Sequence, residues 1–259
     1  MRRTLRGCRT IITGTSSGIG RELALALAAR NARLILNARR VDRLTALAAE
    51  INSLGGEALA VAGDIAEPQT RERLVSTARE SFDGLDLLIN NAGIGAHGPF
   101  AQASPERLRR VMEVNFFAPL ELIRTALPTL SSGNQPMIVN VSSVLGHRAV
   151  PGKSEYCASK FALHGFSDSL RAELVPSKID VLLVSPSTTE TEFFDNVLER
   201  GDEHKSNRKP MSASAVAHKT VRAIEHGRHE IILSGKGKAL VWLDRLFPSL
   251  MDHLVARFG

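Results

Sequence analysis

The chain has 259 residues, of which 43% are hydrophobic and 23% are charged, and it is long enough to bury a large core. Two cysteines make no disulfide framework and fit a reducing, cytoplasmic compartment, and no apolar run approaches the roughly 18 residues that a membrane-spanning helix needs. The net charge of +6 comes from scattered Lys and Arg residues without interleaved aromatic residues, so we expect no nucleic-acid partner.

Strand-like and helix-like hydrophobic patterns alternate along the chain. Strands are expected at 9–13, 33–37, 57–62, 85–89, 136–141, 179–184 and 229–233. Helices are expected at 18–30, 40–53, 68–82, 104–127, 154–175 and 212–226. This alternation predicts an α/β fold, in which a mainly parallel seven-stranded sheet carries helices on both faces.

The first predicted strand leads into a glycine-rich turn that opens the first predicted helix. Glycine allows a positive φ and lets a ligand approach the backbone closely. The free N–H groups and the dipole at the start of a helix favour a bound pyrophosphate. Nucleotide binding is therefore predicted, against the alternative of a tight turn without a ligand, for the segment Thr13-Gly14-Thr15-Ser16-Ser17-Gly18-Ile19-Gly20.

A later apolar strand ends in two hydroxyl side chains, Ser142 and Ser143. In a parallel sheet, ligands bind outside the carboxyl ends of the strands. Ser143 is therefore expected where a hydroxyl can hold a carbonyl or alcohol oxygen, although serine is also common in the loops that follow strands.

Tyr156 and Lys160 lie four residues apart, a spacing that places both side chains on one face of a helix. A tyrosine normally titrates near pH ~10, and a unit charge at about 4 Å contributes about 4 kcal/mol, or roughly three pKa units. The pair therefore predicts a phenol whose pKa is lowered toward working pH, where acid–base catalysis is efficient. The alternative is a buried tyrosine with a lysine extended beside it.

Together these motifs resemble the classical short-chain dehydrogenase/reductase family. The matching motifs stand in the family's order and spacing, and they are T-G-x-x-x-G-I-G at 13–20, Asn90-Asn91-Ala92-Gly93, Asn115, Ser143 and Tyr156/Lys160. The resemblance implies one Rossmann-like, doubly wound domain over residues 1–259. It also implies an oxidoreductase that transfers a hydride between a nicotinamide cofactor and a small-molecule carbonyl or alcohol substrate.

The resemblance assigns roles to particular residues. Tyr156 would donate or accept the proton, Ser143 would hold the substrate oxygen, and Lys160 would lower the pKa of the tyrosine and bind the nicotinamide ribose. The Asn115 region would anchor a water that links Lys160 to solvent. Besides Tyr156 and Lys160, the cofactor would contact Gly14, Ser16, Ser17, Gly18, Ile19, Gly20, Arg39, Arg40, Asp64, Ile65, Asn91, Ala92, Gly93, Pro186 and Thr191.

The end of the second predicted strand bears on the choice of cofactor. An NAD-specific site usually presents a carboxylate there to the ribose 2′-hydroxyl, whereas this chain presents Arg39 and Arg40. Arginine forms forked, charge-assisted contacts with phosphate. We therefore expect NADP(H) to be preferred over NAD(H), with Arg39 as the main contact to the 2′-phosphate and Arg40 stacked on adenine. The alternative is a solvated basic start of a helix.

One segment departs from the family pattern P-G-x-x-x-T. Proline and threonine match at Pro186 and Thr191, but Ser187 replaces the glycine. Because serine tolerates a positive φ less well than glycine, the local turn is expected to differ.

Residues 187–211 are expected to form a substrate lid. An apolar lid suits a hydrophobic carbonyl substrate, and the alternative is a helix that buries its own face on the sheet edge. The apolar side chains in question are Phe193, Phe194, Val197 and Leu198. His97, His147 and Arg148 are expected on loops near the mouth of the pocket, as ordinary loop residues or, for Arg148, as a selector of acidic substrates. No His/Cys cluster has metal-ligand spacing, so no metal is expected.

A helical tail is predicted over 236–259, with a break at Pro248. Three interpretations of its apolar residues stay open: packing on the chain's own body, a subunit interface, or peripheral contact with a membrane surface. The family resemblance implies a homodimer or homotetramer, formed through the helices near 104–127 and 154–175.

Two other functions compete with carbonyl reduction. The chain could be a catalytically silent NADP(H)-binding sensor or scaffold, because a fold does not determine a function. It could also be an epimerase or dehydratase that retains its cofactor. The joint presence of Asn115, Ser143, Tyr156 and Lys160 favours the oxidoreductase.

Overall fold

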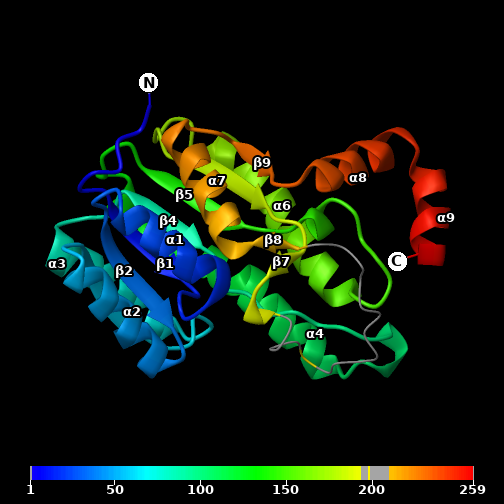
Figure 1. Ribbon diagram of the computed structural model, residues 1–259, viewed down its shortest axis with the longest axis horizontal. Coiled ribbons are helices and arrows are strands. Elements are labelled where there is room, and N and C mark those ends of the chain that lie inside the picture. Colours follow the sequence, from blue (N-terminus) through cyan, green and yellow to red (C-terminus); the bar gives the residue numbers. More distant parts are fainter. Residues whose placement is uncertain (1, 194–197, 199–209, 259) are drawn as a thin grey trace.

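Seven parallel strands form the central sheet of the computed structural model, which describes residues 2–193, 198 and 210–258 (Figure 1). Their order across the sheet is β3-β2-β1-β4-β5-β6-β9. The strands are β1 (Arg9–Thr13), β2 (Arg33–Ala38), β3 (Glu57–Ala62), β4 (Leu87–Asn90), β5 (Met137–Val141), β6 (Asp180–Ser185) and β9 (Glu230–Ile232). The order changes direction between β1 and β4, which confirms the predicted doubly wound α/β fold.

Helices cover both faces of this sheet, as predicted (Figure 1). One face buries aliphatic side chains of α1, α2 and α7, and the other buries those of α3, α5 and α6. The helices are α1 (Gly18–Ala28), α2 (Val41–Ser53), α3 (Pro68–Phe82), α4 (Pro105–Met112), α5 (Ala118–Leu130), α6 (Ser154–Glu173) and α7 (Ala213–Glu225). Each strand end therefore opens between two helical layers, where the loops that carry the predicted site residues begin.

The predicted helix at 104–127 is divided in the structure. Between α4 and α5 the chain widens into one π-helical turn, η2 (Glu113–Phe117). Pro119 supplies the reason, because it has no N–H to donate to the carbonyl of Asn115 four residues earlier. Single π turns of this kind occur often at functional sites, and this one contains Asn115.

Short elements connect the larger ones. They are the 3₁₀ turns η1 (Phe100–Gln102) and η3 (Val144–Gly146) and the strands β7 (Thr189–Glu190) and β8 (Met211–Ser212). β7 and β8 pair in parallel and join the two ends of the expected lid. Leu198 forms an isolated bridge with Ala96, and its N–H donates to the carbonyl of Gly95 at 3.0 Å. Phe194 and Val197, two of the four expected lid residues, lie outside the described residues.

A buried polar ladder joins the sheet to α6. The Nδ2 atom of Asn90 donates to the Oδ1 atom of Asn140 at 2.9 Å, and Nδ2 of Asn140 donates to the hydroxyl of Ser167 at the same distance. The Ser167 hydroxyl in turn donates to the carbonyl of Leu163 at 2.6 Å. Since an unpaired buried amide is costly, this chain of bonds fixes α6 against β4 and β5.

The tail forms two helices, α8 (Gly235–Leu246) and α9 (Pro248–Phe258), which divide at the predicted proline and extend past the β9 edge of the sheet (Figure 1). Arg148 holds the tail through ion pairs with Asp244 and Asp252, both at 2.7 Å. Val241 and Met251 are buried. Most large apolar side chains of the tail are exposed, namely Trp242, Leu243, Leu246, Phe247, Leu250 and Leu254. Packing on the body therefore accounts for little of the tail's apolar surface.

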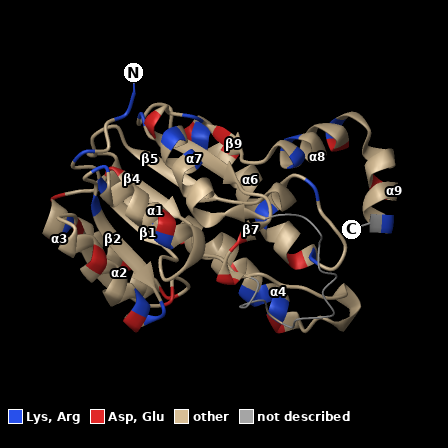
Figure 2. Ribbon diagram, viewed as in Figure 1, with Lys and Arg blue, Asp and Glu red and all other residues tan. Residues whose placement is uncertain are grey.

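Charged residues of both signs are mingled over the helices (Figure 2). Many form surface ion pairs, such as that between Arg33 and Glu57. Among the described residues, no helix combines the length and the apolar character needed to cross a membrane.

Candidate active site

The glycine-rich turn between β1 and α1 is packed too closely for larger residues. Gly14 has φ +72°, and a Cβ atom there would lie 2.8 Å from the Cα atom of Ala92. Gly18 has φ +55°, and a Cβ atom would lie 2.9 Å from Cγ2 of Thr191. A Cβ atom on Gly20 would collide with the carbonyl oxygen of Gly14. The three glycines thus form the kind of backbone cradle at a helix N-terminus that suits a pyrophosphate.

The loop after β4 is locked to this turn. The Thr13 hydroxyl accepts the N–H groups of Asn91 and Ala92, each at 3.0 Å. The Asn91 side chain donates to the carbonyls of Thr13 and Gly14, at 2.9 and 3.1 Å. The predicted pyrophosphate residues and the predicted ribose residues are therefore neighbours in one rigid loop pair, with Ile19 packed against the core below them.

The two predicted phosphate-reading arginines occupy different surroundings. Arg40 donates to the hydroxyls of Ser16 and Ser17, at 2.9 and 2.8 Å, and pairs with Glu192 at 2.8 Å. Arg39 is exposed, and its charge acts on Asp64. Glu192 also pairs with Arg43 at 2.6 Å. Sequence reasoning missed this carboxylate, because nothing in the spacing relates it to Arg40.

Asp64 and Ile65 follow β3 as predicted, and Ile65 is buried. Burial acts to raise the pKa of Asp64, but the N–H of Ala66 and the guanidinium of Arg110 outweigh it and leave the pKa lowered. Asp64 and Arg110 form an ion pair that links this loop to α4. The acid is therefore ionised, and its Oδ1 atom accepts the Ala66 N–H at 3.0 Å.

Asn115 holds the loop that contains Gly93. Its side chain accepts the N–H of Ile94 at 2.8 Å and donates to the Ile94 carbonyl at 2.9 Å and to the Ser159 hydroxyl at 3.0 Å. A Cβ atom on Gly93 would lie 3.2 Å from Oδ1 of Asn115 and 3.7 Å from Nζ of Lys160. Asn115, Gly93 and Lys160 therefore meet at one point, although they lie far apart in sequence.

Ser143 and Tyr156 meet at the carboxyl end of β5. Ser143 caps η3 by accepting the N–H of Leu145 at 3.1 Å. Burial raises the pKa of Tyr156 to about 12, while a hydrogen bond with Ser143 acts in the opposite direction. The predicted lowering of the Tyr156 pKa by Lys160 is wrong for this structure, because the cost of burying a phenolate exceeds the opposing effects.

Lys160 is buried on the same face of α6. Its Nζ atom lies 5.8 Å from the centroid of the Tyr156 ring and donates to the carbonyl of Val141 at 3.0 Å. Burial lowers the pKa of Lys160 to about 8. The lysine is therefore charged at neutral pH and loses its proton only slightly above it.

The segment after β6 closes the site from the other side. The carbonyl of Pro186 accepts the N–H of Val144 at 2.9 Å, which ties this segment to η3. Thr191 touches Gly18, as described above. Ser187 is not among the residues with a positive φ, so serine occupies this position without backbone strain.

Phe193, from the expected lid, lies against Tyr156. The two ring centroids are 5.7 Å apart and the rings meet at 62°, an edge-to-face contact. This contact places an apolar wall beside the phenol.

His97 lies on its loop and Arg148 is paired with the tail, whereas His147 lies beside His164 and Glu230.

A buried ion pair supports the helix that carries the phenol. The guanidinium of Arg107 in α4 contacts Glu155, the residue before Tyr156, at 2.6 and 3.0 Å. Their side chains are 2% and 1% exposed. Burial acts to raise the pKa of Glu155, but Arg107 holds it below its usual value. Sequence reasoning missed this pair, since only the fold brings α4 and α6 together.

Comparison with known proteins agrees with this geometry. Residues 9–201 match the family model described as short chain dehydrogenase. Dehydrogenase/reductase SDR family member 7B of Bos taurus is 32% identical over 268 residues, which cover 99% of this chain and 82% of that protein.

Two solved structures share the fold. A short chain dehydrogenase/reductase of Burkholderia phymatum in complex with NAD superposes with a TM-score of 0.88 at 26% identity, over 96% of each chain. A short chain dehydrogenase of Burkholderia cenocepacia in complex with NADP gives a TM-score of 0.79 at 30% identity, over 88% of this chain and 96% of the other. The glycine cradle, the Ser143–Tyr156–Lys160 set and these matches lead to one conclusion: the chain belongs to the short-chain dehydrogenase/reductase family of oxidoreductases.

Proposed function

We propose that the protein is an NADP(H)-dependent oxidoreductase that interconverts a carbonyl and an alcohol, with Tyr156 as proton donor and acceptor. The observation that carries this proposal is that Ser143, Tyr156 and Lys160 lie together beside Gly93. They lie at the carboxyl ends of the strands, where the glycine cradle also opens. The relatives in complex with NAD and with NADP support a nicotinamide cofactor.

The cradle fits such a cofactor. Gly14, Gly18 and Gly20 would hold its pyrophosphate, and the loop from Asn91 to Gly93 would line its ribose. Asp64 and Ile65 would contact adenine, and Pro186 and Thr191 the nicotinamide side. Arg39 is exposed beside Arg40 and would bind the 2′-phosphate of the cofactor. This position supports a preference for NADP(H).

The bound nicotinamide supplies or accepts the hydride. Ser143 and Tyr156 hydrogen-bond the substrate oxygen. Because burial keeps Tyr156 protonated at neutral pH, its O–H can donate to that oxygen as negative charge develops on it. The Lys160 ammonium favours the phenolate that remains, and with a pKa of about 8 it is suited to pass a proton back to it.

Asn115 acts through positioning in this scheme. By fixing the Ile94 backbone and Ser159, it holds Gly93 and α6 in register, so that Lys160 keeps its place under the phenol. The π turn around Asn115 would anchor the water that links Lys160 to solvent. Oxidation of an alcohol uses the same groups in reverse.

The wall made by Phe193 favours a substrate with an apolar group beside its carbonyl. The same proposal includes a substrate lid over 187–211 and a single catalytic domain over 1–259. It also includes a homo-oligomeric state and a cytoplasmic location. The alternative is a silent NADP(H)-binding sensor or scaffold, which the complete catalytic set disfavours because binding alone needs no Tyr156.

A paired titration followed by a substrate panel tests the proposal. NADPH and NADH binding are measured by cofactor fluorescence, and NADPH oxidation is then followed with ketones, aldehydes and 3-oxoacyl thioesters. We expect tighter binding of NADPH and turnover of at least one apolar carbonyl class. Binding without turnover on any class would favour the sensor, and binding of neither cofactor would contradict the proposal.

A further inference from the structure

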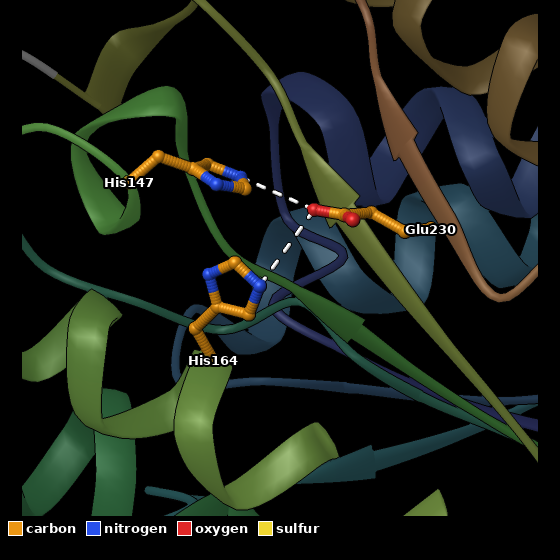
Figure 3. A group of neighbouring side chains, drawn as sticks. All are labelled: His147, His164 and Glu230. Carbon is orange, nitrogen blue, oxygen red and sulfur yellow. Dashed lines mark ion pairs between the residues drawn. The ribbon is translucent and has the colours of Figure 1, made fainter. Parts of the chain in front are cut away.

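Three side chains outside the catalytic set point toward one another at the β9 edge of the sheet (Figure 3). They are His147, just after η3, His164 in α6 and Glu230 at the start of β9. One ligand atom from each lies within 4.8 Å of the other two. Imidazole and carboxylate are the ligand types that zinc-like ions take in proteins.

The separations are close to those that a tetrahedral ion requires. Bonds of about 2.0–2.1 Å from a zinc ion to nitrogen and oxygen place two ligand atoms about 3.4 Å apart. The Oε1 atom of Glu230 lies 3.3 Å from Nε2 of His147 and 3.7 Å from Nε2 of His164. The ligand nitrogens of His147 and His164 lie within 4.8 Å of each other. To reach the tetrahedral separation they would need to approach by no more than about 1.4 Å. Small rotations of two side chains would complete the geometry.

The surroundings of the rings suit metal binding. The Nδ1 atom of His164 lies 3.4 Å from the carbonyl oxygen of Gly146, the usual partner of a ligating imidazole's second nitrogen, and this leaves Nε2 turned toward Glu230. The side chain of His147 is 2% exposed. Its Nδ1 atom is buried and has no hydrogen-bond partner among the described residues, so its ring is held only through Nε2, which lies 3.0 Å from the Ser185 hydroxyl.

Charged groups of both signs lie around the site. Arg245 opposes a bound cation, whereas Glu230 and the nearby carboxylate of Asp168, 3.8 Å from His164, favour one.

The site also has an entrance. Glu230 lines a surface hollow of about 520 Å³. The other residues around the hollow are Arg228, Ile231, Ile232, Lys238 and Trp242. An ion can therefore reach the Glu230 carboxylate from solvent, and its fourth position would be left to water.

We propose that His147, His164 and Glu230 bind one divalent transition-metal ion of the zinc type. The ion joins three elements that sequence spacing keeps apart: the loop that begins at Ser143, the helix that carries Tyr156, and the edge strand β9. Its role is to clamp that loop and helix together beside the reaction site, and it takes no part in hydride transfer.

Metal titration of the full-length chain, prepared without a histidine tag, tests this site. Zn²⁺ binding is measured by calorimetry in excess Mg²⁺, and Co²⁺ is followed by the visible absorption of a tetrahedral complex. We expect one ion per chain and a rise in Tm on Zn²⁺ addition, because an ion that binds the folded state stabilises it. Neither readout depends on catalytic turnover.

Matched variants separate the site from ordinary surface histidines. Glu230→Gln and His164→Gln should each weaken binding by at least about tenfold and abolish the rise in Tm. His226→Gln, which changes an exposed histidine directly after α7, should leave both unchanged. Circular dichroism checks that each variant is folded, and Glu230→Gln is at a partly exposed edge where loss of fold is not expected. The proposal is overturned if the parent chain shows no saturable site, or if Glu230→Gln binds Zn²⁺ as tightly as His226→Gln.

Discussion

Burial, more than charge, governs the two central side chains. The spacing of Tyr156 and Lys160 predicts an ammonium that lowers the pKa of a phenol, yet the structure raises the pKa of Tyr156 to about 12 and lowers that of Lys160 to about 8. Both shifts have desolvation as their largest cause. Carbonyl reduction requires a protonated tyrosine that donates its proton. This environment therefore favours Tyr156 as a proton donor over Tyr156 as a phenolate base.

The lowered pKa of Lys160 makes a prediction for stability. Between pH about 8 and its ordinary value of 10.5, the unfolded chain holds a proton on this lysine that the folded chain has released. The lysine's contribution to the free energy of unfolding should therefore increase across this interval as pH rises. Urea unfolding of the parent chain and Lys160→Met, at pH values from 7 to 10, measures the contribution as a difference.

The difference between the two chains removes the shared effects of Tyr156 and Cys8, whose raised pKa values act in the opposite direction at high pH. We expect the parent chain to gain stability relative to Lys160→Met above pH 8. If the difference in the free energy of unfolding stays constant with pH, burial does not lower the pKa of Lys160.

Cofactor preference should depend on Arg39 and Glu192. Loss of a charge-assisted phosphate contact costs about 1.5–3 kcal/mol, so Arg39→Ala should weaken NADPH binding by roughly tenfold to a hundredfold and leave NADH binding nearly unchanged. Glu192→Gln should instead strengthen NADPH binding, because Glu192 pairs with Arg40 and Arg43 where a phosphate would compete with it. Fluorescence titration of both cofactors measures these effects.

Arg6→Ala, which alters an exposed arginine at the chain's start, is the control for general loss of positive charge. Equal losses of NADPH and NADH affinity in Arg39→Ala would show that Arg39 does not read the 2′-phosphate.

At the level of elements, α6 organises the site. Its first turn places Glu155 and Tyr156, its second places Ser159 and Lys160, and Ser167 anchors it to the sheet through the asparagine ladder. The buried pair of Arg107 and Glu155 fixes where this helix starts, and with it the phenol.

That pair predicts a large loss of stability when it is broken. Arg107→Met would leave Glu155 buried and unpaired by its main cation, which should cost about 3–5 kcal/mol of the free energy of unfolding. Urea denaturation at pH 7 measures the loss. The matched control is Arg124→Met, which breaks an exposed pair with Glu121 and should change stability by less than about 1 kcal/mol. Similar small losses in both variants would contradict the importance of burial.

The element boundaries were largely predictable, because hydrophobic periodicity is a local property. All seven sheet strands and the helices α1, α2, α3, α6 and α7 match the predicted ranges within a few residues. The division at η2 was not predicted, since the periodicity of 104–127 continues through it and only Pro119 marks the break. Contacts between distant elements, such as Glu192 with Arg40, depend on the fold and have no local signal.

For the whole molecule, exposed aromatic residues mark a candidate surface for the proposed homo-oligomer. Phe117 is 48% exposed and Phe161 is 43% exposed, and both lie on the helical segments where the family resemblance implies an interface. Phe117 continues an aromatic row with Phe116 and Phe166, whose successive ring centroids lie 5.3 and 6.4 Å apart. Large exposed apolar side chains that lie together are typical of interaction surfaces.

If the protein forms the proposed homo-oligomer through this surface, we expect the parent chain to be oligomeric in light scattering and the double variant Phe117→Glu/Phe161→Glu to be a monomer. Buried carboxylates would be unpaired in the interface, which is strongly unfavourable. Leu54→Glu, a change at a more exposed apolar residue directly after α2, should leave the mass unchanged. If the double variant keeps the parent mass, the interface lies elsewhere, and the exposed face of α8 and α9 becomes the next surface to test.

The candidate site could be predicted residue by residue where it follows short motifs. The structure brings together the glycine cradle, the loop from Asn91 to Gly93, and Ser143, Tyr156 and Lys160. Desolvation at Tyr156 could not be predicted, because the depth of burial depends on every element packed around it. The group formed by His147, His164 and Glu230 was missed for the same reason, since its members come from three elements.

The most direct test of the whole account compares the parent enzyme with Tyr156→Phe. Turnover of a carbonyl substrate and NADPH binding are measured on both chains at neutral pH. We predict that the variant loses turnover by a factor of about 10²–10⁴, the usual contribution of a positioned proton donor, while its affinity for NADPH stays unchanged. A variant that retains turnover would contradict the assignment of Tyr156 as the proton donor on which this account rests.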